Sequence, residues 1–192
     1  MKRRTIFFTA ALAIGAIAIT ATVAMPRRLI WNASASVPVG LYAVQEVNQF
    51  RIGDLLAATP PPEIEEFLAG GGYVPAGVPL IKHVAALPGQ TICRIGNTIT
   101  VDMRVVGQAR KLNSRDRPLP YWQGCLTLVP QQIFLMNTAM PDSLDGRYFG
   151  PFERSDIIGR AVAIWTDDAG DGRYFWHGFN PPATQAQTQK GE

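Results

Sequence analysis

Two residues in this sequence have the side chains and the surroundings for nucleophilic chemistry. Ser36 lies in the segment 32–42 (NASASVPVGLY), and Lys82 lies in the apolar run 80–86 (LIKHVAA). A serine hydroxyl is a weak nucleophile until a base removes its proton, and a lysine in apolar surroundings can be that base because desolvation lowers its pKa. The pair therefore predicts Ser-Lys hydrolase chemistry.

The base can be chosen from a short list. Arginine does not deprotonate in proteins, and the four lysines of the sequence are Lys2, Lys82, Lys111 and Lys190. Only Lys82 has apolar neighbours on both sides. The alternative is a lysine whose stem packs along an edge strand while its ammonium reaches water, and Lys82 taken alone fits that description as well.

Ser34 and Ser36 are two residues apart, so on an extended segment their side chains point to the same face. One could attack a carbonyl carbon while the other donates a hydrogen bond to the oxyanion that forms. The alternative is a polar linker of small residues. A histidine-based triad fits less well, because His83 would lie on the opposite strand face from Lys82 and His177 is near the C-terminus.

We expect no metal and no cofactor. Two histidines and two cysteines without ligand spacing make no recognisable zinc site. The acidic stretch 167–172 lacks the oxygen ligands that a calcium loop needs at its third and twelfth positions. The sequence has no glycine motif for phosphate binding. The net charge of +3 comes without a basic cluster beyond residues 1–28, so nucleic acid is not an expected partner.

The N-terminus is typical of a membrane anchor. Residues 2–4 are basic, and residues 5–25 carry no charge and are long enough, at about 1.5 Å per residue, to cross a hydrocarbon layer of roughly 30 Å. A cleavable signal peptide is the alternative, although its apolar region is normally about 7 to 15 residues long. Arginines flank both ends, so the positive-inside rule favours a cytoplasmic N-terminus only weakly. We predict a cytoplasmic tip and transmembrane anchor over residues 1–28.

Short apolar or alternating runs between glycines and prolines predict a mainly β, largely antiparallel domain with few helices. The predicted strands are 41–47, 54–58, 78–85, 91–95, 98–102, 133–136 and 158–165. Gly96-Asn97 predicts a two-residue hairpin turn, and residues 63–69 predict a short helix that ends at the glycines 70–72. One domain is expected over residues 29–168, followed by a polar, partly disordered extension over 169–192.

Cys93 and Cys125 are the two cysteines, and both lie beyond the apolar N-terminal segment. In an oxidising compartment outside the membrane they would form a disulfide, which would fit an exported domain. Two buried free thiols are the alternative.

Several of these stretches together resemble the bacterial signal peptidase I superfamily (peptidase family S26), and specifically its conjugative-transfer branch, the TraF-type peptidases. Segment 32–42 is similar to the family's nucleophile segment, in which a serine two residues before a proline attacks, and this marks Ser36. Segment 81–89 (IKHVAALPG) is similar to the lysine box and assigns the base to Lys82. Segment 142–151 (DSLDGRYFGP) resembles the C-terminal box.

The resemblance implies roles for further residues. Ser34 takes the place of the oxyanion-hole serine, beside the backbone N–H of Ser36. The supporting residues fall on Ser143, Asp145 and Arg147. The resemblance also implies a signal-peptidase-like fold and a disulfide between Cys93 and Cys125. His83, Gln90 and the pair Asn137-Thr138 depart from the family pattern, although none of them replaces a proposed catalytic group.

What the resemblance implies is a single-pass enzyme of the inner (cytoplasmic) membrane with a periplasmic catalytic domain. Neutral Lys82 would take the proton of Ser36, which would cleave an exported precursor, such as a conjugative pilin subunit, through an acyl-enzyme. Water would resolve this intermediate, or an amine of the substrate would do so and give a cyclic product. Expected partners are the precursor, membrane lipid and other conjugative transfer proteins.

Two other interpretations stay open. One is a non-catalytic, membrane-tethered β-domain that acts as a scaffold in a conjugative transfer or pilus assembly complex. The other is a self-cleaving Ser-Lys repressor, against which the apolar N-terminal segment and the lack of a DNA-binding domain argue.

Overall fold

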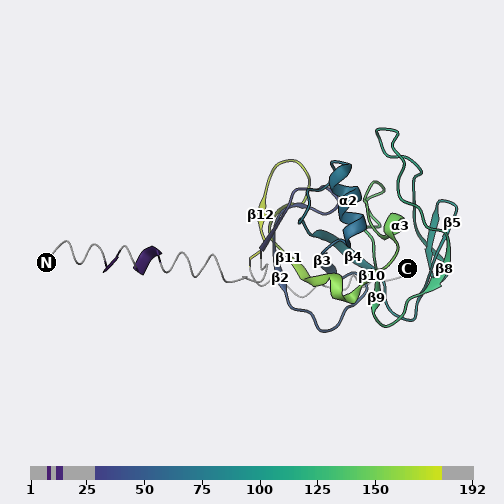
Figure 1. Ribbon diagram of the computed structural model, residues 1–192, viewed down its shortest axis with the longest axis horizontal. Helices are drawn as coiled ribbons and strands as arrows, with labels where there is room; N and C mark the ends of the chain where they lie inside the picture. Colours follow the sequence, from purple (N-terminus) through teal and green to yellow (C-terminus); the bar gives the residue numbers. More distant parts are fainter. Residues whose placement is uncertain (1–7, 10–11, 15–28, 179–192) are drawn as a thin grey trace, which may run out of the picture.

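The computed structural model describes residues 8–9, 12–14 and 29–178 (Figure 1). The predicted anchor over residues 1–28 therefore lies almost entirely outside the described residues. None of the helices within the described ranges is both long and apolar enough to cross a membrane.

Residues 29–178 form two antiparallel sheets. The larger has eight strands in the order β1-β2-β11-β3-β4-β9-β10, with β12 beside β11, and the smaller has four in the order β7-β6-β5-β8. The strands of the larger sheet are β1 (Leu29–Asn32), β2 (Val39–Gln45), β3 (Leu55–Ala58), β4 (Leu80–Ala86), β9 (Gln132–Leu135), β10 (Phe152–Glu153), β11 (Ile157–Asp167) and β12 (Phe175–Trp176). Those of the smaller sheet are β5 (Thr91–Ile95), β6 (Thr98–Val101), β7 (Arg104–Gln108) and β8 (Gly124–Thr127).

Helices are few within residues 29–178: α2 (Pro62–Gly70), α3 (Gly146–Phe149) and the single 3-10 turn η1 (Arg154–Asp156). The structure thus confirms a mainly antiparallel β-fold with few helices. Every strand predicted from the sequence is present, with ends that differ by at most two residues, and the predicted helix corresponds to α2.

The β5–β6 hairpin shows how local pattern becomes structure. Ile92 of β5 faces the core, as do Ile99 and Val101 of β6, and the intervening side chains are more exposed. The two strands pair antiparallel across the predicted two-residue turn. Gly96 has a φ of 60°, which suits the first turn position of a type II′ hairpin, where glycine is favoured.

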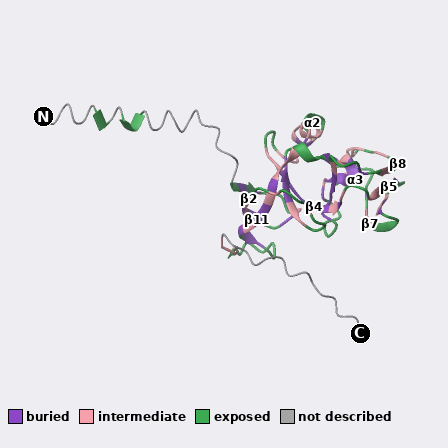
Figure 2. Ribbon diagram, turned by 90° about the horizontal axis from the view of Figure 1, so that it is seen from below, coloured by how far each residue is buried: buried purple, intermediate pink, exposed green. Residues whose placement is uncertain are grey.

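Core packing fixes β4, the strand that carries Lys82. Leu80 and Val84 belong to one buried cluster with Leu135 of β9, whereas Ile81 belongs to a different cluster on the opposite face. Full burial of one such side chain stabilises the fold by about 1.5 to 3 kcal/mol. Figure 2 shows this buried interior along β4 and β11 and at α3. Lys82 shares the face of Leu80 and Val84, so its side chain is held against apolar surroundings.

The structure also contains strands that the sequence patterns did not predict, namely β1, β7, β8, β10 and β12. β1 pairs with β2 and is the end strand of the larger sheet. β12, within the segment 169–192, pairs with β11 at Trp165 and Thr166. Residues 179–192 lie outside the described residues, so the disorder expected there remains a prediction.

Candidate active site

Ser36 lies in the turn that connects β1 to β2, and one asparagine side chain organises this turn. The Nδ2 group of Asn32 donates to the carbonyl oxygens of Ser34 (2.8 Å), Pro38 (3.0 Å) and Val37 (3.1 Å). Its Oδ1 accepts from the backbone N–H of Ser34 at 3.1 Å and from the Ser34 hydroxyl at 2.9 Å. Asn32 is buried, so it fixes the path of the backbone on both sides of Ser36.

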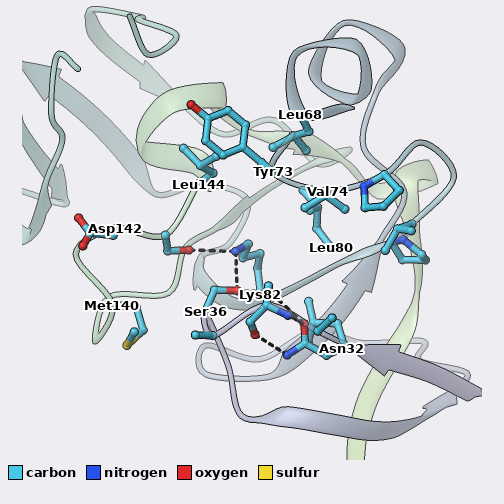
Figure 3. Close-up of a pocket in the computed structure, with 18 of the residues that line it drawn as sticks. Asn32, Ser36, Leu68, Tyr73, Val74, Leu80, Lys82, Met140, Asp142 and Leu144 are labelled. Carbon is cyan, nitrogen blue, oxygen red and sulfur yellow. Dashed lines mark hydrogen bonds between the residues drawn. The ribbon is translucent and has the colours of Figure 1, made fainter. Parts of the chain in front are cut away.

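The nucleophile and the base predicted from the sequence are in direct contact. Lys82 Nζ lies 3.0 Å from Ser36 Oγ and 2.9 Å from Ser143 Oγ, and as an ammonium it donates to both hydroxyls. Figure 3 shows the Ser36 and Lys82 side chains pointing toward one another. Ser34 Oγ lies 3.1 Å from Ser36 Oγ. Four sequence-predicted site residues from three separate segments therefore meet at one point.

The environment of Lys82 changes its protonation. The residue is 4% exposed. Burial lowers the pKa of Lys82 from 10.5 to about 8, while the Asp145 carboxylate opposes this shift and the Arg147 guanidinium adds to it. With a pKa of about 8, roughly a tenth of the molecules carry a neutral Lys82 at pH 7 and roughly nine-tenths at pH 9. A neutral amine can accept the proton of Ser36.

Asp145 and Arg147 form a buried ion pair behind the site. Arg147 Nε lies 2.8 Å from Asp145 Oδ1 and Nη2 lies 3.1 Å from Oδ2, and the side chains are 1% and 0% exposed. The Asp145 carboxylate also caps α3 by accepting the backbone N–H of Arg147. Removing one partner of such a pair typically costs about 3 to 5 kcal/mol, because a buried charge is left uncompensated. Neither side chain lines the pockets around Ser36.

Arg147 holds the β9–α3 loop (residues 136–145), which carries Ser143. Its guanidinium donates to the carbonyl oxygens of Asn137 and Pro141, both at 2.9 Å, and of Met140 at 3.1 Å. The position of Ser143 against Lys82 thus depends on a guanidinium that does not itself touch the lysine.

Asn137 is a site residue that the sequence analysis noted only as a departure from the family pattern. It is 2% exposed, and its Nδ2 donates to the carbonyl oxygens of Ser36 at 2.9 Å and of Ile81 at 3.3 Å. Its Oδ1 accepts from the backbone N–H of His83 at 3.0 Å, and its own N–H donates to Asp145 Oδ2 at 3.0 Å. The Asn137 side chain therefore joins its own loop, β9–α3, to β4 and to the β1–β2 turn that carries the predicted nucleophile Ser36, which we call the nucleophile turn.

A mainly apolar pocket of about 450 Å³ opens at the Ser36 hydroxyl (Figure 3). We call it the Lys82 pocket. It is bordered by residues 31–36, by residues 78–82, by Leu68, Tyr73 and Val74, and by Met140 and residues 142–144. Ser36, Lys82 and Ser143 all line this pocket.

The remaining predicted residues lie away from this point. Cys93 and Cys125 occupy directly paired positions on β5 and β8, and the structure joins them in a disulfide. Neither cysteine lines a pocket at Ser36. Within the described residues, no group of three or more His, Cys, Asp or Glu side chains is arranged to hold a metal ion.

The chain is similar to several known proteins. The family described as signal peptidase, peptidase S26, matches residues 2–166. The conjugal transfer protein TraF of Agrobacterium fabrum is 32% identical over 71% of this chain and 82% of its own length. The protein of the same name from Agrobacterium tumefaciens is 30% identical over 85% of this chain and 97% of its own length. A crystal structure of a signal peptidase I from Enterococcus faecalis aligns with 60% of this chain and 98% of its own, at 18% identity and a TM-score of 0.36.

The family match spans most of the chain and includes all three segments on which the resemblance was based. It therefore confirms that resemblance. The chain belongs to the signal peptidase family, peptidase S26.

Proposed function

We propose that this protein is a membrane-anchored serine endopeptidase that cleaves an exported precursor, with Ser36 as nucleophile and Lys82 as general base. The observation that carries the proposal is the 3.0 Å contact between Lys82 Nζ and Ser36 Oγ, made by a lysine that is 4% exposed. A buried amine within hydrogen-bond distance of a hydroxyl is the arrangement that activates a serine.

The proposed reaction has two halves. Neutral Lys82 accepts the Ser36 proton as Oγ bonds to the carbonyl carbon of the scissile peptide. The resulting ammonium then donates that proton to the leaving amine, and an acyl ester on Ser36 remains. In the second half, water or a substrate amine attacks the ester, and its proton passes through Lys82 back to Ser36 Oγ. Ser143, whose Oγ lies 2.9 Å from Nζ, orients the Lys82 side chain in both its neutral and its charged form.

The oxyanion would be held by the Ser34 hydroxyl and the backbone N–H of Ser36. In support, Ser34 Oγ lies 3.1 Å from Ser36 Oγ, on the same side of the turn as the attacking atom. Asn32 fixes this turn and accepts a hydrogen bond from the Ser34 hydroxyl at 2.9 Å, so the Ser34 hydroxyl would turn its proton from Asn32 Oδ1 to the oxyanion when substrate binds.

The acyl segment of the substrate would lie extended in the Lys82 pocket, between two open strand edges. β1 pairs only with β2 within the described residues, and it supplies Trp31 and Asn32 to the pocket. On the other wall, β9 pairs with β4 at Val84 and Ala86, so the first half of β4 has a strand neighbour on one side only in the described part of the chain. An extended peptide could add to both edges. From the family resemblance we expect small residues such as alanine before the cut.

The names of the relatives suggest the biological setting. Because similar proteins are conjugal transfer proteins, we infer that the precursor is a pilin-type subunit of a conjugative system. The uncharged segment 5–25 supports a single-pass location in the inner membrane, and the disulfide supports a periplasmic catalytic domain. Membrane lipid and other transfer proteins would be its partners.

Co-expression with a candidate pilin precursor, followed by mass spectrometry of the pilin, tests the proposal. We expect the wild type to give a shortened pilin, with a cyclic product lighter than the linear one by one water. Ser36→Ala should leave the precursor intact, whereas Ser155→Ala, at an exposed serine in η1, should process it normally. Processing by the Ser36→Ala protein would contradict the proposal and favour the non-catalytic scaffold.

A further inference from the structure

A second pocket, of about 800 Å³, opens beside Ser36. In the described part of the chain its lining shares only Ala35, Ser36 and Met140 with that of the Lys82 pocket. The Lys82 pocket is lined by residues 31–34 and 78–82. The second pocket is lined by the residues that come next in these two segments, 37–39 and 83–85. The two pockets therefore follow one another along the same two chain segments, with the nucleophile between them.

The two pockets differ in how they can hold a peptide. The Lys82 pocket offers open strand edges, which suit the acyl segment because that segment must stay bound through both halves of the reaction. Beside the second pocket, β4 is already paired with β9 at Val84 and Ala86. A peptide there would contact mainly side chains. Weaker contacts of this kind suit the segment that has to leave after the first half of the reaction.

The lining of the second pocket combines an apolar surface with negative charge. Its apolar part includes Ile52, Val84, Val106 and Met136. Among the described residues that line it are two carboxylates, Asp167 and Asp168, and no lysine or arginine. The pocket therefore complements a peptide that carries an apolar residue together with a cationic one.

Asp168 is the carboxylate with capacity for a ligand. The Asp167 oxygens are occupied by the backbone N–H groups of Asp171 (3.1 Å) and Gly172 (2.8 Å) and are buried in that turn. Asp168 Oδ1 accepts from Thr166 Oγ1 at 2.6 Å, and Oδ2 lies 3.2 Å from His177 Nε2. The Asp168 side chain is 47% exposed. A carboxylate has about four acceptor positions, so Asp168 can still accept from an incoming cation.

We propose that this second pocket is the leaving-segment pocket, which binds the residues of the precursor after the scissile bond and favours a lysine or arginine there against Asp168. This inference rests on the proposed peptidase function, because only a peptidase has a leaving segment. It assigns a specificity determinant to a carboxylate at the end of β11, outside the three segments that carry the family resemblance.

The test measures kcat/KM of the full-length enzyme on a panel of precursors. In each precursor one of the first four residues after the cut is changed to Lys, Ala or Glu. At one or more positions we expect Lys to be cleaved about 2- to 5-fold more efficiently than Glu, the upper part of the range for one partly exposed charge pair. Asp168→Asn, which keeps the shape and the bond from Thr166, should remove this preference.

Charge reversal and a matched control complete the design. Asp168→Lys should invert the preference in favour of Glu. Asp171→Asn alters a carboxylate of the same turn that lines neither pocket, so it should keep the preference for Lys. Equal cleavage of Lys and Glu precursors, or a preference that survives in folded Asp168→Asn, would overturn the pocket assignment while the peptidase function stood. Failure of the wild type to cleave any precursor in a Ser36-dependent way would instead overturn the proposed function itself.

Discussion

At the scale of single residues, the central feature is a lysine that is buried at a cost to stability. A charged Lys82 is disfavoured in its apolar surroundings, which is why burial lowers its pKa to about 8. The same shift makes the amine a usable base near neutral pH. Under the proposed mechanism, the burial of Lys82 therefore favours activity while it lowers the stability of the fold.

The first prediction concerns the pH dependence of cleavage. Because the base must be neutral, kcat/KM should rise as pH increases through about 8 and then level off. Initial rates on a precursor at concentrations well below KM, measured from pH 6 to pH 10, test this. A rate that does not change across that range would contradict a lysine base.

The second prediction concerns the stability cost of Lys82. A folded-state pKa of about 8, against 10.5 for the unfolded chain, costs about 3 kcal/mol below pH 8. That penalty should disappear as pH rises from 8 to above 10, because the unfolded state then also loses its proton.

Lys82→Met removes the charge at similar volume but loses the bonds to two hydroxyls. We expect the inactive Lys82→Met variant to have a higher urea midpoint of unfolding than the wild type at pH 7. The difference between the two midpoints should be smaller at pH 10. A higher urea midpoint for the wild type than for Lys82→Met at pH 7 would contradict the proposed cost of burying a charged Lys82.

The third prediction concerns Asn137. Asn137→Ala removes the bonds to Ser36 O and Ile81 O, so the nucleophile turn and the Lys82 strand lose their shared clamp. Misplacement of about 1 Å can cost on the order of 100-fold, so we expect kcat to fall by about 10- to 100-fold. The midpoint of the pH profile should stay near 8 if Lys82 remains buried. Asn48→Ala, at an exposed loop asparagine, is the control. An unchanged kcat in folded Asn137→Ala would remove Asn137 from the positioning machinery.

At the scale of secondary-structure elements, the site depends on how closely β2 lies against β11. Gly40 of β2 has a φ of 149°, and a Cβ atom there would come closer than 3.0 Å to the carbonyl oxygen of Trp165. A backbone atom cannot move aside as a flexible side chain can. This glycine therefore allows the sheet to hold the end of the nucleophile turn.

The fourth prediction follows from that close approach. Gly40→Ala should lower the free energy of unfolding by about 2 kcal/mol or more, because it combines a steric clash with an unfavourable backbone conformation. Gly70→Ala is the matched control, since a Cβ atom at the end of α2 meets nothing within 4 Å. Urea denaturation of both variants measures the difference. Equal midpoints for the two variants would show that the sheet can relax around an added methyl group.

Elements differed in how far the sequence could predict them. β5 and β6 were predicted because alternation and turn chemistry are local properties, and Ser36 and Lys82 because their segments match family motifs. β1 was not predicted, because four residues directly after the apolar N-terminal segment carry too little pattern of their own. Asn137 could not be assigned a role for a different reason. Its key bond joins residues 101 positions apart, and only the assembled sheet brings them together.

At the scale of the whole molecule, the candidate site residues and the disulfide lie on different sheets. The larger sheet carries Ser36 at the turn after β1 and Lys82 on β4, with β11 and β3 between β2 and β4. The smaller sheet carries the disulfide on β5 and β8. Its β5 and β6 residues Ile92 and Ile99 share a buried cluster with Phe134 of β9. The disulfide therefore links two strands of the sheet that packs against β9.

The fifth prediction separates the stabilising effect of this disulfide from catalysis. The disulfide links residues 32 positions apart, so the chain-entropy account gives about 3 to 4 kcal/mol of stabilisation. The double variant Cys93→Ser, Cys125→Ser should therefore melt about 10 °C lower than the wild type. Its kcat/KM at 20 °C should match the wild type, because neither cysteine lines a pocket at Ser36.

Treating the wild type with a reductant should give the same shift in Tm, which controls for the two new hydroxyls. A large loss of kcat/KM at a temperature where the variant is folded would mean that the smaller sheet positions the β9–α3 loop, and the two sheets would then act as one catalytic unit.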